Sequence, residues 1–144
     1  MGKLEIVGYE PLLDDIKALI HEKQYQILSV ANEETIKLYL RIGEEIFTRQ
    51  EEKGWGKSIV QVLSTELQKE FPGAKGYSAA NLWRMRNFYL TYRDSKKLAP
   101  LAREISWSNN VVIMEKCKDD LQREFYIRMA KRFGWTKRIL TNFI

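Results

Sequence analysis

Apolar side chains return at helical spacing over the first third of the chain. No proline lies between Pro11 and Pro72, and apolar residues recur every three or four positions over residues 11–50. They are Ile16, Leu19, Ile20, Ile27, Val30, Ala31, Leu38, Ile42 and Ile46. After a short extended segment, residues 1–10, the pattern predicts one long helix from Leu12 to about Gln50, or two helices broken near Asn32.

A continuous helix of this length would span roughly 60 Å, which exceeds the width of a compact domain this size. A second copy of the chain is the simplest way to cover its apolar side, so an unbroken helix predicts a homodimer. A break near Asn32 would instead fold the second half back. Gly43 lies inside the helix, where glycine is unfavourable, so we expect another backbone to approach closely there.

Residues 57–92 read as two amphipathic helices joined by a turn. The first has an apolar stripe that predicts a core-facing side. Its members are Ile59, Val60, Leu63, Leu67 and Phe71. Pro72 and Gly73 should end that helix, and Ser78 should cap the second, which then begins near Ala79. Trp55, in the connection before this pair, is expected to pack on the core.

The two sides of the second helix differ in chemistry. A wheel of 100° per residue turns one apolar set toward the core: Leu82, Met85, Phe88, Tyr89 and Tyr92. It turns Trp83, Arg84 and Asn87 the other way, with Arg86 near the boundary and Lys75 and Tyr77 in the preceding turn. Arginine suits guanine and asparagine suits adenine in the major groove, where the second helix of a helix-turn-helix lies. This side is therefore a candidate DNA-reading surface.

The remaining sequence predicts further helices over residues 106–144, after a polar connector over residues 93–100. Ser108 to about Cys117 reads as a short helix, with a strand as the alternative because of its β-branched run. A helix after Asp119 carries Leu121, Phe125, Met129 and Phe133 at four-residue steps and ends at Gly134. Thr136 should cap a last helix with three apolar residues facing inward: Ile139, Leu140 and Phe143. The fold class is therefore an all-α, multi-helix domain with a long N-terminal helix and a helix-turn-helix-like core.

Charge is distributed unevenly along the chain. The formal net charge is +5, but residues 1–50 carry six Lys or Arg against nine acidic residues, while residues 51–100 and 101–144 each carry nine against five. This favours an anionic partner for the later part of the chain. Lys131, Arg132, Lys137 and Arg138 could extend a phosphate-contacting surface, or could simply be solvated.

Little in the sequence favours catalysis or a cofactor. Cys117 is the single cysteine, so paired cysteines cannot build a zinc site, and a buried structural thiol is the simpler reading. We expect no metal, no cofactor and no enzymatic activity in these residues. Apolar runs are too short to cross a bilayer and the start lacks a secretory pattern, so a cytoplasmic protein is expected.

Several short blocks resemble the N-terminal domain of the YhcG family. Its G-[FY]-S-x-x-N-L-x-x-M-R-x-F-Y signature is matched by Gly76, Tyr77, Ser78, Asn81, Leu82, Met85, Arg86, Phe88 and Tyr89. Further blocks around Leu38–Gly43, Ile105–Ser108, Arg123–Tyr126 and Trp135–Arg138 extend the likeness over most of the chain. The resemblance implies an all-helical, helix-turn-helix-like, DNA-binding module that usually precedes a PD-(D/E)XK nuclease domain. The sequence stops at Ile144, about where that domain would begin, so nuclease activity is not expected here.

Two functions follow as hypotheses. In the first, Trp83, Arg84 and Asn87 approach a DNA groove while Lys75, Tyr77 and Arg86 touch its backbone. In the second, the long helix mediates self-association and the Trp83 surface docks a nuclease domain or another partner. The two are compatible, since dimers commonly present paired recognition helices.

Overall fold

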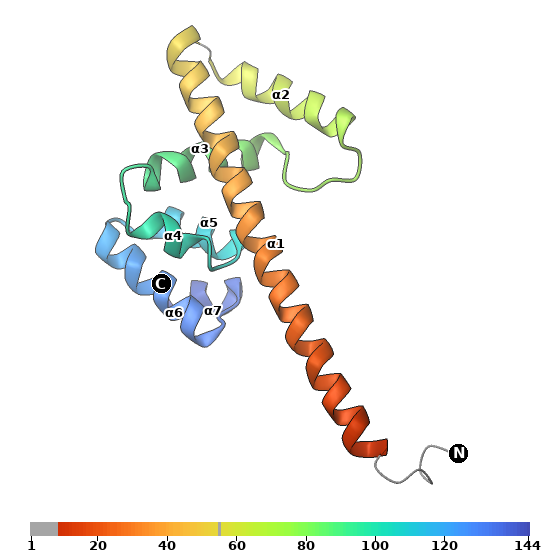
Figure 1. Ribbon diagram of the computed structural model, residues 1–144. Coiled ribbons are helices and arrows are strands. Elements are labelled where there is room, and N and C mark those ends of the chain that lie inside the picture. The colour runs from red at the N-terminus through yellow and green to blue at the C-terminus, as the bar shows by residue number, and fades with distance from the viewer. Residues whose placement is uncertain (1–8, 55) are drawn as a thin grey trace. The chain divides into compact units, whose positions relative to one another are not determined.

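The computed structural model describes residues 9–54 and 56–144, and over these ranges the chain is all-α, as predicted. Figure 1 shows its helices. Their bounds are α1 Tyr9–Lys53, α2 Lys57–Glu70, α3 Ala79–Tyr92, α4 Leu98–Ala102, α5 Trp107–Lys116, α6 Asp120–Phe133 and α7 Lys137–Phe143. By its internal contacts the chain divides into two units, Met1–Ala31 and Asn32–Ile144.

Helix α1 is continuous through Asn32, so the alternative of a break there is wrong. The Asn32 side chain instead donates Nδ2 hydrogen bonds to the carbonyls of Arg103, at 3.1 Å, and Ile105, at 2.9 Å. The prediction of an extended segment over residues 1–10 is also wrong at its end, because Tyr9 and Glu10 are already helical. Residues 1–8 and Trp55 lie outside the described residues, and so does the packing predicted for that tryptophan.

In the first unit, large apolar side chains of α1 are exposed. They are Leu12, Ile16, Leu19, Ile20, Tyr25, Ile27, Leu28 and Val30. At 100° per residue, six of them (Leu12, Ile16, Leu19, Ile20, Ile27 and Val30) share an arc of about 100°, interrupted by Lys23. We call these six residues the N-terminal stripe.

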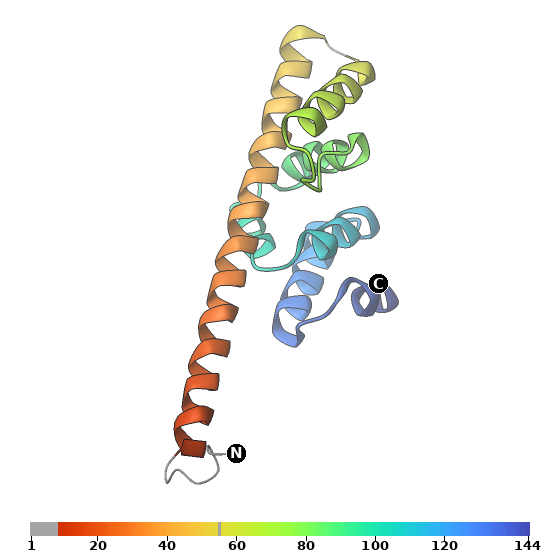
Figure 2. The same cartoon turned by 90° about the vertical axis from the view of Figure 1, so that its right-hand side faces the viewer.

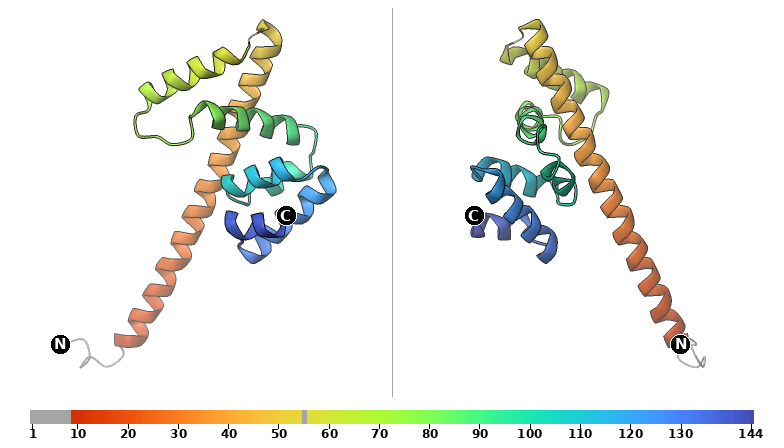
Figure 3. Two further views of the ribbon diagram at one scale, coloured as in Figure 1. Left: turned by 180° about the vertical axis from the view of Figure 1, so that it is seen from behind. Right: turned by 60° about the vertical axis from the view of Figure 1, so that its left-hand side comes forward.

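The core of the second unit consists of two neighbouring clusters. One gathers Ile36, Phe88, Tyr92, Leu98, Ala102, Ile105, Val112, Ile113, Cys117, Ile127, Ala130 and Leu140. The other gathers Ile46, Val60, Leu82 and Met85, and Trp107 packs against both clusters. Figures 2 and 3 show α5, α6 and α7 beside one another at the C-terminal end of this unit. Helix α3 therefore lies between the α2 layer and the C-terminal helices, with contacts to α2 and α5.

Gly43 allows α1 and α3 to touch backbone to backbone. A Cβ atom built at this position would overlap the carbonyl group of Met85. The close approach expected from a glycine inside a helix is therefore confirmed, and it lies where α1 crosses the middle of α3.

The α2–α3 pair has the predicted limits. Its connection covers residues 71–78, which is longer than the turn of about three or four residues usual in helix-turn-helix motifs. Hydrogen bonds hold this turn, because the carbonyl of Tyr77 accepts from Ser64 Oγ at 2.7 Å and from Gln68 Nε2 at 3.3 Å. Phe71 is 50% exposed, so its assignment to the core is wrong.

The C-terminal helices differ from prediction in which faces are buried. Helix α5 is a helix and not a strand, and it begins at Trp107, one residue before the predicted start, with Ser106 as its cap. The short helix α4 was not predicted, because Pro100 was read as part of a connector; proline is tolerated in a first turn, where its missing N–H has no partner to lose. In α6 the predicted stripe is largely exposed, while Ile127 and Ala130 are buried. In α7 only Leu140 of the three predicted residues is buried.

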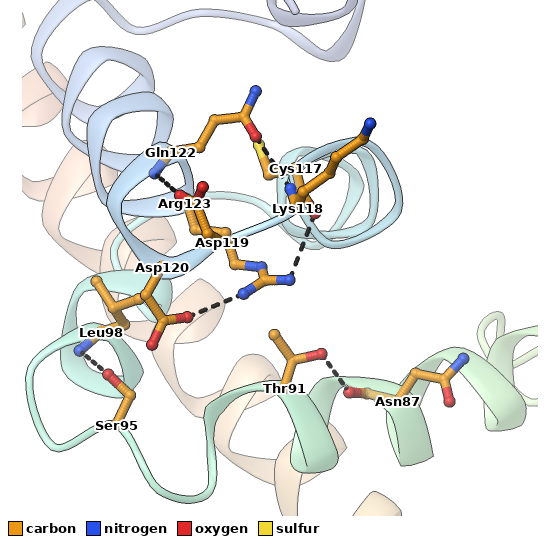
Figure 4. Close-up of polar contacts among 10 residues, drawn as sticks. All are labelled: Asn87, Thr91, Ser95, Leu98, Cys117, Lys118, Asp119, Asp120, Gln122 and Arg123. Carbon is orange, nitrogen blue, oxygen red and sulfur yellow. Dashed lines mark hydrogen bonds and ion pairs between the residues drawn. The ribbon is translucent and has the colours of Figure 1, made fainter.

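Cys117 is a buried free thiol, as expected. Burial raises the pKa of this thiol, which lowers its thiolate fraction and hence its reactivity. Its carbonyl accepts a hydrogen bond from Arg123, whose guanidinium also pairs with Asp120 at 2.9 Å (Figure 4). The segment between α5 and α6 is therefore fixed by polar contacts.

Within the described part of the chain, no helix is long and apolar enough to cross a membrane.

Candidate nucleic-acid interface

The start of α3 is fixed by three polar side chains. Ser78 Oγ accepts from the backbone N–H of Asn81 at 3.2 Å and so caps the helix. The buried Asn81 side chain donates to the carbonyl of Gly76 at 2.8 Å and accepts from Trp107 Nε1 at 2.8 Å. Asn81 thus ties the turn, α3 and α5 together. Sequence reasoning used Asn81 only as a signature residue and missed this structural role.

Three of the predicted site residues are exposed: Lys75, Arg84 and Asn87. Arg84 Nε lies 3.9 Å from Glu115 Oε1, and both side chains are about half in solvent. Such a pair contributes little free energy, so Arg84 can exchange this partner for another anion. The main-chain carbonyl of Asn87 accepts a hydrogen bond from Thr91 Oγ1 at 2.7 Å (Figure 4), and its side chain has no hydrogen-bond partner among the described residues. Its carboxamide remains available.

Trp83 is not the outward-facing group that the helical wheel predicted. It is half-buried and packs against the cluster of Ile46, Val60, Leu82 and Met85. The wheel failed here because α3 is covered from more than one direction. The hypothesis of a docking surface built on an exposed Trp83 loses its main support.

Arg86 and Tyr77 are also engaged within the protein. Arg86 Nε donates to Gln50 Oε1 at 2.7 Å, and its guanidinium lies over the rings of Phe47 and Trp83 at 5.3 and 5.5 Å. The half-buried Tyr77 ring packs against the second core cluster. Arg86 therefore fastens α3 to α1, and assigning it to DNA backbone contact does not fit its partners.

One groove is lined by residues of α3, α5 and α7. It has a volume of about 390 Å³ and brings together the cationic side chains of Arg84, Lys116 and Lys137. Glu115 is the acidic residue in this lining, and Ser108 and Thr141 add hydroxyl groups. The other lining residues are Asn81, Trp107, Val111 and Val112. Cations and hydroxyls around an open groove suit the binding of phosphate groups.

A second groove shares part of its lining with the first. Its volume is about 400 Å³, and it is lined by Arg84, Asn87, Leu90, Thr91, Met114 and Glu115. Arg84 and Glu115 line both grooves. The ion pair therefore borders both the groove of Lys116 and Lys137 and the groove that holds the exposed Asn87.

Lys116 was not predicted as a site residue, and Lys137 was assigned only to a basic cluster that could equally be solvated. No sequence motif near Lys116 or Lys137 identifies it as a site residue, because each belongs to a helix far along the chain from α3. The available signal was the excess of basic residues over 101–144. Among the described residues, no group of three or more His, Cys, Asp or Glu could hold a metal ion.

Comparison with curated proteins and with solved structures gives no match. A family model, described as the DUF1016 N-terminal domain, matches residues 15–144. The match includes the signature residues of α3, the groove residues of α5 and α7, and most of α1. It agrees with the resemblance noted in the sequence, and the chain therefore belongs to the DUF1016 N-terminal domain family, the N-terminal domain of YhcG proteins.

Proposed function

We propose that this chain is a non-catalytic module that binds duplex DNA at the groove between α3, α5 and α7. The observation that carries the proposal is the convergence of Arg84, Lys116 and Lys137 on that groove. When cations grouped on one surface neutralise phosphates, the counterions condensed on the DNA are released, and this release is a main source of affinity for DNA. The net charge of +4 over residues 101–144, nine basic residues against five acidic, favours the same partner.

Base contacts would come from the exposed side of α3. Arg84 and Asn87 are three residues apart, so they lie on one helical face. Arginine can donate two hydrogen bonds to guanine, and asparagine can pair with adenine. Lys75, exposed in the turn before α3, is suited to a flanking phosphate. Trp83, Arg86 and Tyr77 have the structural role of holding α3 in place.

Fluorescence anisotropy with a labelled 20-base-pair duplex, measured at several salt concentrations, tests this proposal. Arg84→Ala and Lys137→Ala should each weaken binding and reduce the slope of log K against log salt by about 0.9 for each phosphate that is no longer neutralised. Lys57→Ala is the matched control, because Lys57 is exposed on α2, outside the groove lining. Equal weakening in all three variants would indicate a diffuse charge effect, and the absence of binding at low salt would overturn the proposal.

A second candidate function, self-association, has its own support. The N-terminal stripe of the first unit consists of large apolar side chains without cover in the described chain. Paired helices bury such stripes against each other. A homodimer formed this way would present two copies of the groove. In either case the family resemblance favours a role as the targeting or accessory part of a nuclease system.

Sedimentation equilibrium measures this association. Wild-type protein is expected to be dimeric, and Ile20→Glu should shift it to monomer because a carboxylate would be buried in the seam. Ser29→Glu adds the same charge outside the N-terminal stripe and should leave the dimer intact. A monomeric wild-type protein at 100 µM would refute the dimer without affecting the DNA proposal.

A further inference from the structure

Three aromatic rings stack where α6 meets α7. The ring centroids of Phe133 and Trp135 are 6.1 Å apart with an interplanar angle of 23°, and those of Trp135 and Phe143 are 4.6 Å apart at 8°. Phe133 is 54% exposed and Phe143 is 61% exposed, although both are large and apolar. The two outer members of the stack therefore present ring surface to solvent.

The local backbone holds this stack in place. Gly134 ends α6 in the left-handed conformation, at φ 62°, and Thr136 caps α7. The carbonyl of Trp135 accepts from Asn109 Nδ2 at 2.8 Å, which links the stack to the buried face of α5. The Tyr126 hydroxyl donates to the carbonyl of Phe143 at 3.1 Å. The rings are thus preorganised, which reduces the entropy lost when a ligand binds.

The chain segment that carries the stack is cationic, although Glu104 lines a groove together with Lys131 and Arg132. Residues 125–144 contain five Lys or Arg and no Asp or Glu. The nearest preceding acid, Glu124, is already paired with Lys97 and Arg128 at 2.9 Å each. Arg132 lies 5.3 Å from the centroid of the Phe133 ring. Arg138 and Lys131 are exposed and have no ion-pair partner among the described residues.

From this combination we propose that the Phe133–Trp135–Phe143 stack binds unpaired nucleotides of a single strand. A base would stack on the outer face of Phe143, or on Phe133 once the Arg132 guanidinium moves from its place over that ring, while Lys131, Arg132 and Arg138 contact phosphates. Exposed aromatic rings within a cationic surface are the usual means of holding single strands, because every base has a face that can stack. Paired bases inside a duplex do not offer that face. The stack would therefore bind single strands, whereas the groove between α3, α5 and α7 would bind duplex DNA. An apolar protein partner fits the charge less well.

Anisotropy with labelled (dT)10 and (rU)10 tests the stack in the full chain. Phe143→Leu, which removes the ring but keeps an apolar side chain, should weaken single-strand binding on the order of 10-fold. Phe143→Tyr keeps the ring and should bind as wild type. Both variants should bind the 20-base-pair duplex unchanged. A circular dichroism melt confirms that Phe143→Leu is folded, and Phe133→Leu gives a second, independent measure if it is not.

The outcomes separate this site from the groove. Weaker single-strand binding in Phe143→Leu with duplex binding retained supports the stack, whether DNA or RNA binds better. Wild-type protein that binds duplex but neither oligonucleotide overturns the stacking site alone. Single-strand binding that is unchanged in both leucine variants also overturns it. A change of oligomeric state in Phe143→Leu, seen by light scattering, would assign the rings to a protein interface and would equally overturn the proposal.

Discussion

Replacing Gly43 by alanine is expected to lower the free energy of unfolding by about 2–3 kcal/mol, as overpacking of a close contact does. In an exposed helix the same change would stabilise by about 1 kcal/mol. Here the new methyl group would overlap the Met85 carbonyl, and backbone on both sides leaves no flexible side chain to move aside. Helices α1 and α3 would have to separate.

Urea denaturation followed by circular dichroism measures the change. Thr48→Ala, also on α1 but exposed, is the control and should alter stability by no more than about 0.5 kcal/mol. A Gly43→Ala variant as stable as wild type would mean that α1 does not cross α3 at this point.

Asn81→Ala is the second change with a large expected effect, about 2–3 kcal/mol of destabilisation. The side chain makes a hydrogen bond to Gly76 on one side and to Trp107 on the other, both at 2.8 Å. Alanine would leave a carbonyl and an indole N–H without partners in a largely buried setting. The turn, α3 and α5 would lose their common connection, so duplex binding should weaken as well.

Asn87→Ala offers a matched control, since the same residue type on the same helix is exposed there. Its effect on unfolding should stay within about 0.5 kcal/mol. The hydrogen-exchange rate of the Trp107 indole N–H gives a local measure. This rate should increase in Asn81→Ala and stay unchanged in Asn87→Ala. Equal stability of the two variants would contradict the role assigned to Asn81.

Helix positions were largely predictable from the sequence, because capping and periodicity are local. Ser78 caps α3 as expected, and Gly134 ends α6 as expected. Which side of a helix is buried was less predictable. The four-residue repeat through Leu121, Phe125 and Phe133 suggested a core stripe, yet tertiary packing buries a different face of α6.

The candidate site was predictable only in part, for the same reason. Arg84 and Asn87 are exposed as the wheel suggested. Arg86 is not free, because it contacts Gln50 and Phe47, which lie far away in the sequence. Trp83 is half-buried because it packs against the cluster that includes Ile46 and Val60. The contribution of Lys137 to the groove likewise depends on a tertiary arrangement that periodicity does not encode.

A nuclear magnetic resonance titration of the 15N-labelled chain with a short duplex would test the groove most directly. If DNA binds at the groove, the largest amide shifts will fall on residues around Arg84, Ser108 and Lys137, and the amides of α2 will shift little. The shifts should fade as salt is raised, since phosphate contacts supply the affinity. Shifts concentrated on α2 or on residues 12–30, or no shifts at low salt, would contradict it.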